Sequence, residues 1–236
     1  MAYSGFSGSN YLQQPYNSDL DFGTGDFSIC FWVNSSMNTT QYVLDRSNDG
    51  NQRFGIYLTS ANSGSVNLFT NAEGSNYTEV TGVIGTPSIW AQCWCIRRGA
   101  SHEVWVNGVK KAAITGAVRD ITQLDQAPLS VGTRFNQVGP QVGSLALLRI
   151  SATAPSDEQI KKIYEDEKHL FQENAKATLY GTSDAVTALA YDDDTELLHV
   201  GTSAGRSVFQ GLRRIDNTTD AVGAAISASN GMVAED

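Results

Sequence analysis

The chain has only 3 cysteines among its 236 residues, an odd number that does not suit a disulfide framework. Cys93 and Cys95 lie two residues apart in an alternating run. On a strand they would point to the same face, where a bridge between them would be strained. Together with Cys30, they stand where a buried strand would otherwise carry Val or Ile. We therefore expect three reduced, buried cysteines that pack as small hydrophobic residues.

Positive charge is also scarce. The 16 Lys and Arg face 25 Asp and Glu, which gives a formal net charge of −9. Basic residues follow one another at most in pairs, such as Lys110-Lys111 and Arg213-Arg214. Because binding to phosphates needs clustered cations, no nucleic acid partner is expected.

Long hydrophobic runs are missing as well. No stretch approaches the ~20 apolar residues of a membrane span, so no membrane insertion is expected. The N-terminal sequence MAYSGFSGSN has neither the basic start nor the apolar core of a signal peptide. This predicts synthesis in a reducing cytoplasm without a secretion signal.

What the first 150 residues do contain is short alternating runs between turns. In residues 26–33 (DFSICFWV), Phe27, Ile29, Phe31 and Val33 would share one face of a strand. Similar runs occupy residues 41–45, 53–59, 65–70, 78–83, 92–98, 102–106, 129–132 and 143–150. Strands at this spacing without intervening helices predict an all-β fold, an antiparallel two-sheet jelly-roll sandwich.

One helix is expected at the end of this region. Ser156 is a suitable N-cap, and residues 157–158 place two carboxylates in the first turn, near the positive end of the helix dipole. Ile160, Ile163 and Tyr164 form an apolar stripe at helical spacing. The stripe predicts that this C-terminal helix packs on one edge of the sandwich, and that the domain spans residues 1–171.

The pattern changes beyond Phe171. Residues 184–191, 196–201 and 206–215 predict three consecutive strands, and the element at 172–215 looks like one blade of a β-propeller. Because so small a sheet has too little core to stand alone, we expect this three-stranded element to dock on another surface or to mediate oligomerisation. Residues 216–236 are small and polar, which predicts a C-terminal arm that a partner could order.

A hairpin within the sandwich carries the most specific signal. The run at 92–98 turns into the run at 102–106, which ends in Asn107-Gly108, the dipeptide best suited to a type I′ turn. A Trp followed by a hairpin that ends in W-V-N-G resembles the laminin G-like domains, which are concanavalin A-like sandwiches. Three further matches extend the resemblance over about 165 residues. They are the strand D-F-S-I-C-F-W-V, the pair at 43–47 and 54–58, and the closing segments at 129–132, 143–150 and 156–164. The resemblance implies a fold that binds surfaces, mostly glycans, more often than it catalyses reactions.

Catalytic patterns are absent. Glycosidases need two carboxylates across the scissile bond, which the glucanases of this fold family place on an E-x-D-x-x-E strand, and no such strand exists here. His102, His169 and His199 have no G-x-S-x-G partner. We therefore expect a protein that is not an enzyme.

Two kinds of binding site are conceivable. Related domains often hold one Ca²⁺ at the rim, and the loop with Asp45, Asn48 and Asp49 offers clustered oxygen ligands. The run Asp192–Asp194 is a second metal candidate. Plain turns are the alternative for both. For a glycan, the candidates by residue type are Tyr42, Tyr77, Trp94 and Trp105, although alternation would bury at least one of the Trp.

These features together lead to a hypothesis of a non-enzymatic bacteriophage virion structural protein. The sandwich would be displayed outward, as part of a tail fibre, another tail component or a capsid decoration, and the C-terminal element would mount it. Its partners would be other virion proteins, copies of itself and a host-surface glycan. The alternative is a cellular glycan-binding or adhesion module. A glycoside hydrolase of the same fold is a third hypothesis, which the missing carboxylate strand disfavours.

Overall fold

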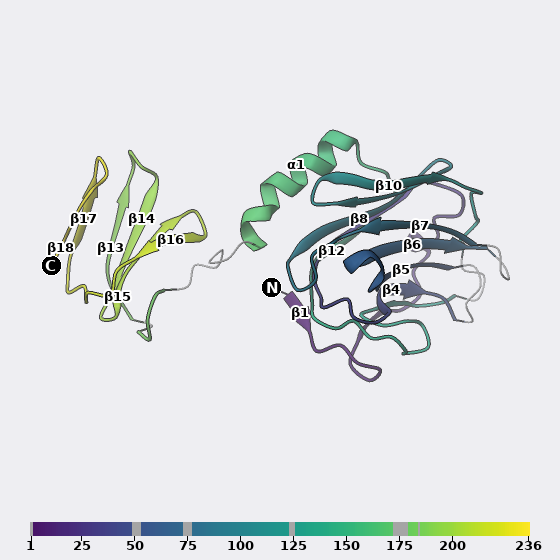
Figure 1. Cartoon of the computed structure of the whole chain (residues 1–236), viewed down its shortest axis with the longest axis horizontal. Coiled ribbons are helices and arrows are strands. Elements are labelled where there is room, and N and C mark those ends of the chain that lie inside the picture. Colours follow the sequence, from purple (N-terminus) through teal and green to yellow (C-terminus); the bar gives the residue numbers. More distant parts are fainter. Residues whose placement is uncertain (1, 49–52, 73–76, 123–125, 172–178, 184) are drawn as a thin grey trace. The chain divides into compact units, whose positions relative to one another are not determined.

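A computed structural model describes residues 2–48, 53–72, 77–122, 126–171, 179–183 and 185–236. The chain forms two compact units, Met1–Tyr164 and Glu165–Asp236 (Figure 1). No helix among the described residues is long and apolar enough to cross a bilayer.

The first unit consists of two antiparallel sheets. One has the order β1 (Ala2–Ser4), β12 (Ser144–Ser151), β3 (Phe27–Asn34), β8 (Ala91–Arg98), β9 (Ser101–Val106) and β10 (Val109–Thr115). The other has the order β2 (Leu12–Gln14), β11 (Leu129–Val131), β4 (Gln41–Arg46), β5 (Arg53–Thr59), β6 (Ser65–Asn71) and β7 (Tyr77–Val83). Short 3₁₀ turns at Ser18–Leu20 and Ala61–Ser63 lie between strands.

The main core fills the space between these sheets. Phe27, Ile29, Phe31 and Val33 of β3 belong to it and are fully buried, as the alternation predicts. The ring of Phe27 lies 5.6 Å, centroid to centroid, from that of Phe54 on the opposing sheet. The prediction of an all-β, antiparallel two-sheet sandwich is confirmed.

The W-V-N-G hairpin has the geometry that its sequence predicts. Asn107 and Gly108 have φ of 51° and 73°, the positive values of a type I′ turn, and Val106 pairs with Val109 across it. Oδ1 of Asn107 also accepts a hydrogen bond from the backbone N–H of Gln92 at 2.9 Å. The turn is thereby fixed to the strand at which the hairpin begins.

Helix α1 (Asp157–Glu167) covers the outer face of the first sheet. Ser156 and Gln159 form a capping box, in which each side chain accepts the backbone N–H of the other, at 3.2 Å and 2.8 Å. Ile160 is fully buried in a second apolar cluster with Cys30, Trp94, Ile96 and Trp105. The helix predicted at the edge of the sandwich therefore lies across a sheet face. A further 3₁₀ turn, Lys168–Phe171, follows it.

The cysteines are free and buried, as expected. Cys93 and Cys95 point into the main core and Cys30 into the cluster below α1. Burial raises the pKa of the Cys93 and Cys95 thiols well above the ordinary range, which keeps both protonated.

The larger sheet of the second unit contains one strand more than the three that its sequence predicts. Its sheet has the order β13 (Val186–Asp192), β14 (Leu197–Thr202), β15 (Gly205–Gln210) and β16 (Arg213–Asn217). The single run expected at 206–215 is broken at Gly211, whose φ of 59° turns the chain back on itself.

The segment 216–236 differs from the arm expected there. Its strands β17 (Ile226–Ser229) and β18 (Met232–Glu235) form a hairpin, and Val222 and Ile226 pack on Ala188 of β13. Arg206 pairs with Glu235 at 3.1 Å. The hairpin is thus ordered by contacts within its own unit, since a few buried apolar residues are enough to hold it on the sheet.

The packing of α1 can be tested at its one fully buried side chain. Replacement of Ile160 by Ala should lower the free energy of unfolding by about 2–5 kcal/mol, because it leaves a cavity over Trp94 and Trp105. Urea unfolding of the whole chain, followed by tryptophan fluorescence, measures this loss. Lys161→Ala, on the exposed side of the same helix, should change it by less than about 0.5 kcal/mol. Equal effects of the two variants would show that α1 does not pack on the sheet.

Candidate functional site

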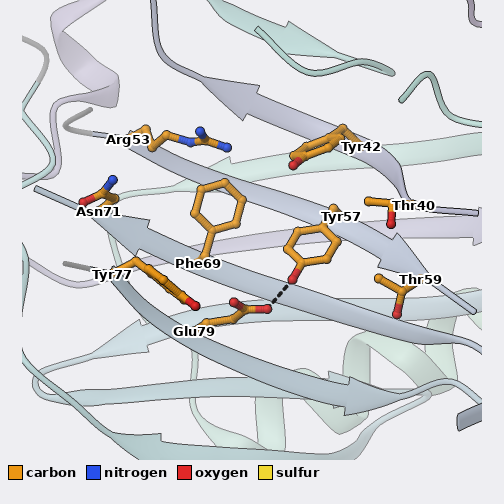
Figure 2. A pocket seen from close by; sticks show the side chains of 9 residues that line it. All are labelled: Thr40, Tyr42, Arg53, Tyr57, Thr59, Phe69, Asn71, Tyr77 and Glu79. Carbon is orange, nitrogen blue, oxygen red and sulfur yellow. Dashed lines mark hydrogen bonds between the residues drawn. The ribbon is translucent and has the colours of Figure 1, made fainter. Parts of the chain in front are cut away.

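The outer face of the second sheet is hollowed into a cleft of about 440 Å³. Strands β5 and β6 alternate, so that Phe54, Ile56, Leu58, Val66 and Leu68 enter the core while the residues between them face outward. Nine outward residues line the cleft: Thr40, Tyr42, Arg53, Tyr57, Thr59, Phe69, Asn71, Tyr77 and Glu79 (Figure 2). The cleft follows from the sandwich, because one face of each strand is committed to the core.

Aromatic rings form a row along the cleft. The rings of Tyr42 and Tyr57 lie 5.6 Å apart and those of Tyr57 and Phe69 lie 5.9 Å apart, centroid to centroid. Gly55 makes room for this row, because a Cβ there would meet Cζ of Phe69 at 2.5 Å. Tyr77 stands at the rim with 57% of its surface exposed.

A polar pair, Tyr57 and Glu79, lies beside the aromatic row (Figure 2). The hydroxyl of Tyr57 donates a hydrogen bond to Oε1 of Glu79 on the neighbouring strand β7. Burial, together with this bond to a carboxylate, raises the pKa of Tyr57 well above its ordinary value, so the phenol stays protonated. The pair places one acceptor-rich carboxylate and one hydroxyl beside the rings.

The end of the cleft beside Phe69 carries a cationic side chain, Arg53. The guanidinium carbon of Arg53 lies 4.5 Å from the ring centroid of Phe69, within cation–π range. Behind it, the buried carboxylate of Asp45 lies 3.4 Å from Nε of Arg53 and 3.9 Å from Nε of Arg134. The backbone N–H of Phe135 donates to Asp45 at 3.3 Å. Two guanidinium groups therefore share one carboxylate.

Burial dominates the titration of Asp45. It raises the pKa of this carboxyl to about 6, although Arg53, the N–H of Phe135 and Arg134 all act in the opposite direction. Because the folded pKa lies above the ordinary ~3.9, the folded state holds this proton more tightly than the unfolded chain does. The contribution of Asp45 to stability is therefore largest below about pH 4 and is lost as the pH rises to about 6.

The structure separates the four aromatic candidates. Tyr42 and Tyr77 both line the cleft. Trp94 and Trp105, in contrast, are 6% and 2% exposed beneath α1, on a different sheet, and present no ring face to solvent. Their indole N–H groups donate to Gln92 and Glu103, at 3.1 Å and 2.9 Å. Alternation puts both Trp on one face, but the helix that covers this face makes them core residues.

The contacts of the described metal candidates do not favour the possible Ca²⁺ site. Asp45 faces Arg53 and Arg134, which supply the positive charge that a cation would bring. Asn48 is exposed, and Asp49 lies outside the described residues. In the second candidate, Asp192 accepts the N–H of Gly231 at 2.7 Å, and Asp194 accepts that of Asn230 at 3.2 Å. No group of three or more His, Cys, Asp or Glu side chains suited to a metal occurs in the described part of the chain.

Several residues of the cleft were not among the candidates, notably Arg53, Tyr57, Phe69 and Glu79. A signal for them exists in the alternation of β5, where Arg53, Tyr57 and Thr59 are interleaved with Phe54, Ile56 and Leu58. The pattern identifies an outward polar and aromatic face. It does not say which strands lie next to β5, so the cleft could not be assembled from it.

Comparison with known families matches this architecture. Residues 6–161 fit a family model described as the concanavalin A-like lectin/glucanases superfamily, of the laminin G type. The chain belongs to this superfamily. The comparison with curated proteins found no match.

Solved structures of the same fold include three informative neighbours. A native heptameric SAP-like pentraxin from Limulus polyphemus has a TM-score of 0.52 and 15% identity, over 69% of this chain and 80% of that one. The IT-sialidase CBM40 of Ruminococcus gnavus bound to α2,3 sialyllactose has a TM-score of 0.52 and 18% identity, over 70% of this chain and 98% of that one. The third is domain 4 of AbnA, a GH43 extracellular arabinanase from Geobacillus stearothermophilus, in complex with arabinotriose. It has a TM-score of 0.52 and 20% identity, over 67% of this chain and 74% of that one. At these identities the likeness establishes the superfamily's sandwich fold and nothing finer.

The balance of burial and charge at Asp45 can be measured directly. We expect its carboxyl carbon to titrate near pH 6 in NMR spectra, well above an ordinary aspartate. The Asp45→Asn variant identifies the signal by its loss. A midpoint at or below pH 4 would mean that the two arginines outweigh desolvation.

Proposed function

We propose that the sandwich binds a saccharide in the cleft on β4–β7 and does not catalyse its cleavage. The observation that carries this proposal is the row formed by Tyr42, Tyr57 and Phe69, with Tyr77 at its rim. A cleft with aromatic surface and a few placed polar groups is the usual form of a small-ligand site.

The chemistry of a sugar suits this lining. The C–H face of a pyranose packs on aromatic rings, which contribute large apolar areas at little entropic cost. Its hydroxyls can donate to the carboxylate of Glu79 and pair with Thr40, Thr59 and Asn71 around the rings. Two solved structures of this fold are described as complexes with saccharides, sialyllactose and arabinotriose, and they support the proposal by analogy.

The same lining speaks against hydrolysis. A glycosidase needs two carboxyl groups about 5–9.5 Å apart on either side of the scissile bond. Glu79 is the one carboxylate among the described residues that line the cleft, and it is engaged by Tyr57. Asp45 lies beneath the floor, buried against Arg53 and Arg134.

Removal of the rim aromatic should weaken binding. On an oligosaccharide array, Tyr77→Ala should bind the saccharides selected by the unmodified chain about 10-fold more weakly, because stacking contributes roughly 1.5 kcal/mol. Tyr191→Ala is the matched control, since Tyr191 is 54% exposed but lies in the other unit. Equal loss in both variants, or steady release of reducing ends from a bound saccharide, would contradict the proposal.

We further propose, as the finer hypothesis, that the chain is a bacteriophage virion component carrying this domain on a tail or capsid. Two features support it. The cysteines are free and buried, as suits a protein assembled in a reducing compartment. The second unit exposes Leu189, Tyr191 and Met232 at 60%, 54% and 72%, apolar surface that other copies or virion proteins would cover.

Purified phage particles provide the test. Antibodies against the sandwich should label virions at a regular position in electron micrographs, and the chain should remain with the particles through density-gradient purification. Absence of label from intact particles would remove the virion assignment. The cellular adhesion module would then be the better hypothesis, while saccharide binding in the cleft would stand.

A further inference from the structure

We propose that the cleft selects saccharides that carry a carboxylate, and that Arg53 is the group that recognises it. This inference rests on the proposed saccharide site and names its ligand class. Arg53 lies at the start of β5, opposite Asn71 of β6, and its guanidinium group projects over Phe69 into the cleft (Figure 2).

Arg53 is also buried, with 7% of its surface exposed, but it differs from Arg46 and Arg97, whose side chains hold the fold together. Arg46 donates to the carbonyl oxygens of Leu20 and Asn17, at 2.7 Å and 3.1 Å, and pairs with Asp21 at 2.7 Å. Arg97 likewise donates from Nε, Nη1 and Nη2 to four backbone carbonyls. Both arginines use their Nη donors within the protein.

The Nη groups of Arg53 have no hydrogen-bond partner among the described residues. Within the described residues its side chain forms an ion pair with Asp45 and lies over the rings of Phe69 and Phe135, but it donates no hydrogen bond. Nε of Arg53 is fully enclosed and has no hydrogen-bond partner in the described part of the chain. Nη1 and Nη2 are not enclosed in this way. Because Arg53 lines the cleft, its two Nη groups are the donors left for a ligand there, and the two rings and Asp45 hold the guanidinium in place.

Local charge favours an anion at this end of the cleft. Asp45 is shared between Arg53 and Arg134, so the two guanidinium groups exceed the one carboxylate behind them. At the Tyr57 side, Glu79 would repel a second carboxylate and accept sugar hydroxyls instead. The cleft thus distinguishes the two ends of a ligand, with the acidic group toward Arg53 and the neutral ring toward Tyr57.

The shape of the donor group selects the acid. A guanidinium presents two parallel N–H groups that match the two oxygens of a carboxylate, and such charge-assisted pairs are about twice as strong as neutral hydrogen bonds. The aromatic surface of Phe69 beside the guanidinium suits the sugar ring that bears the carboxylate. Uronic acids and sialic acids have this combination of a planar anion and an apolar ring face.

Matched ligands provide the test. The full chain is titrated by calorimetry with uronic-acid oligomers and sialic-acid-capped oligosaccharides, each beside its methyl ester, which has the same backbone without the charge. We expect the acids to bind about 10- to 100-fold more tightly than their esters, the range for a charge-assisted hydrogen bond. Arg53→Gln should remove this preference, so that acids and esters bind with similar affinity, and Arg53→Lys should restore part of it.

Arg134→Gln is the matched control. It removes the same charge from the same neighbour, Asp45, but Arg134 does not line the cleft, so most of the preference for the acid should remain. Thermal melting of each variant shows whether the fold is retained.

Equal binding of acids and esters, with loss of both in Tyr77→Ala, would overturn the assignment of Arg53 and leave the saccharide site standing. Loss of the preference to the same extent in both Gln variants would also overturn it, because general charge rather than contact would be responsible. No binding of any acid, ester or array saccharide would overturn the saccharide site itself.

Discussion

Face-to-face packing of the two six-stranded sheets is the constraint on which the rest of the first unit depends. It commits one face of each central strand to the core, where Phe27 of one sheet meets Phe54 of the other. Each sheet then has one face left over. On the first sheet α1 covers it through Ile160, and on the second it forms the aromatic cleft. A structural face and the proposed binding face thus arise from the same period-two pattern.

The sandwich fold could be predicted from the sequence because the patterns that indicate it are local. The alternation in 26–33, the turn at Asn107-Gly108 and the capping box from Ser156 to Gln159 depend on residues close together in the chain, and the structure confirms each. The hairpin at 226–235 was missed because most residues of the segment 216–236 are small or polar and its apolar residues are few. Its stability comes from Val222 and Ile226 against Ala188, about 35 residues earlier in the chain.

A sequence signal for this hairpin does exist. The segment T-S-D-A-V at 182–186 returns as T-T-D-A-V at 218–222, and each copy precedes an antiparallel hairpin. Val222 of the second copy packs against the hairpin that follows the first copy, since a Cβ on Gly201 would lie 2.6 Å from it. Recognition of this repeat would have predicted strands where composition alone predicts an arm.

The candidate site was only partly predictable, and the tryptophans show why. Trp94 and Tyr42 are both aromatic residues on outward strand faces, and residue type favours Trp94 as a platform. The difference lies in what covers each face. A helix more than 60 residues later in the sequence covers Trp94, whereas Tyr42 lines a cleft. Which faces stay open is a tertiary property, and neither residue type nor alternation encodes it.

The ion-pair cluster of Asp45, Arg53 and Arg134 is expected to contribute little to the stability of the fold. A buried carboxylate costs desolvation free energy that its ion pairs rarely repay in full, and apolar residues of similar size often stabilise a fold as well or better. Asp45 bears this cost, as its raised pKa shows. In return the carboxylate holds the guanidinium of Arg53 from behind, while Phe69 supports it from the side. A cation fixed in this way loses little entropy when it pairs with an anion. The desolvation cost of Asp45 is therefore consistent with the proposed role of Arg53 as a preorganised binding group.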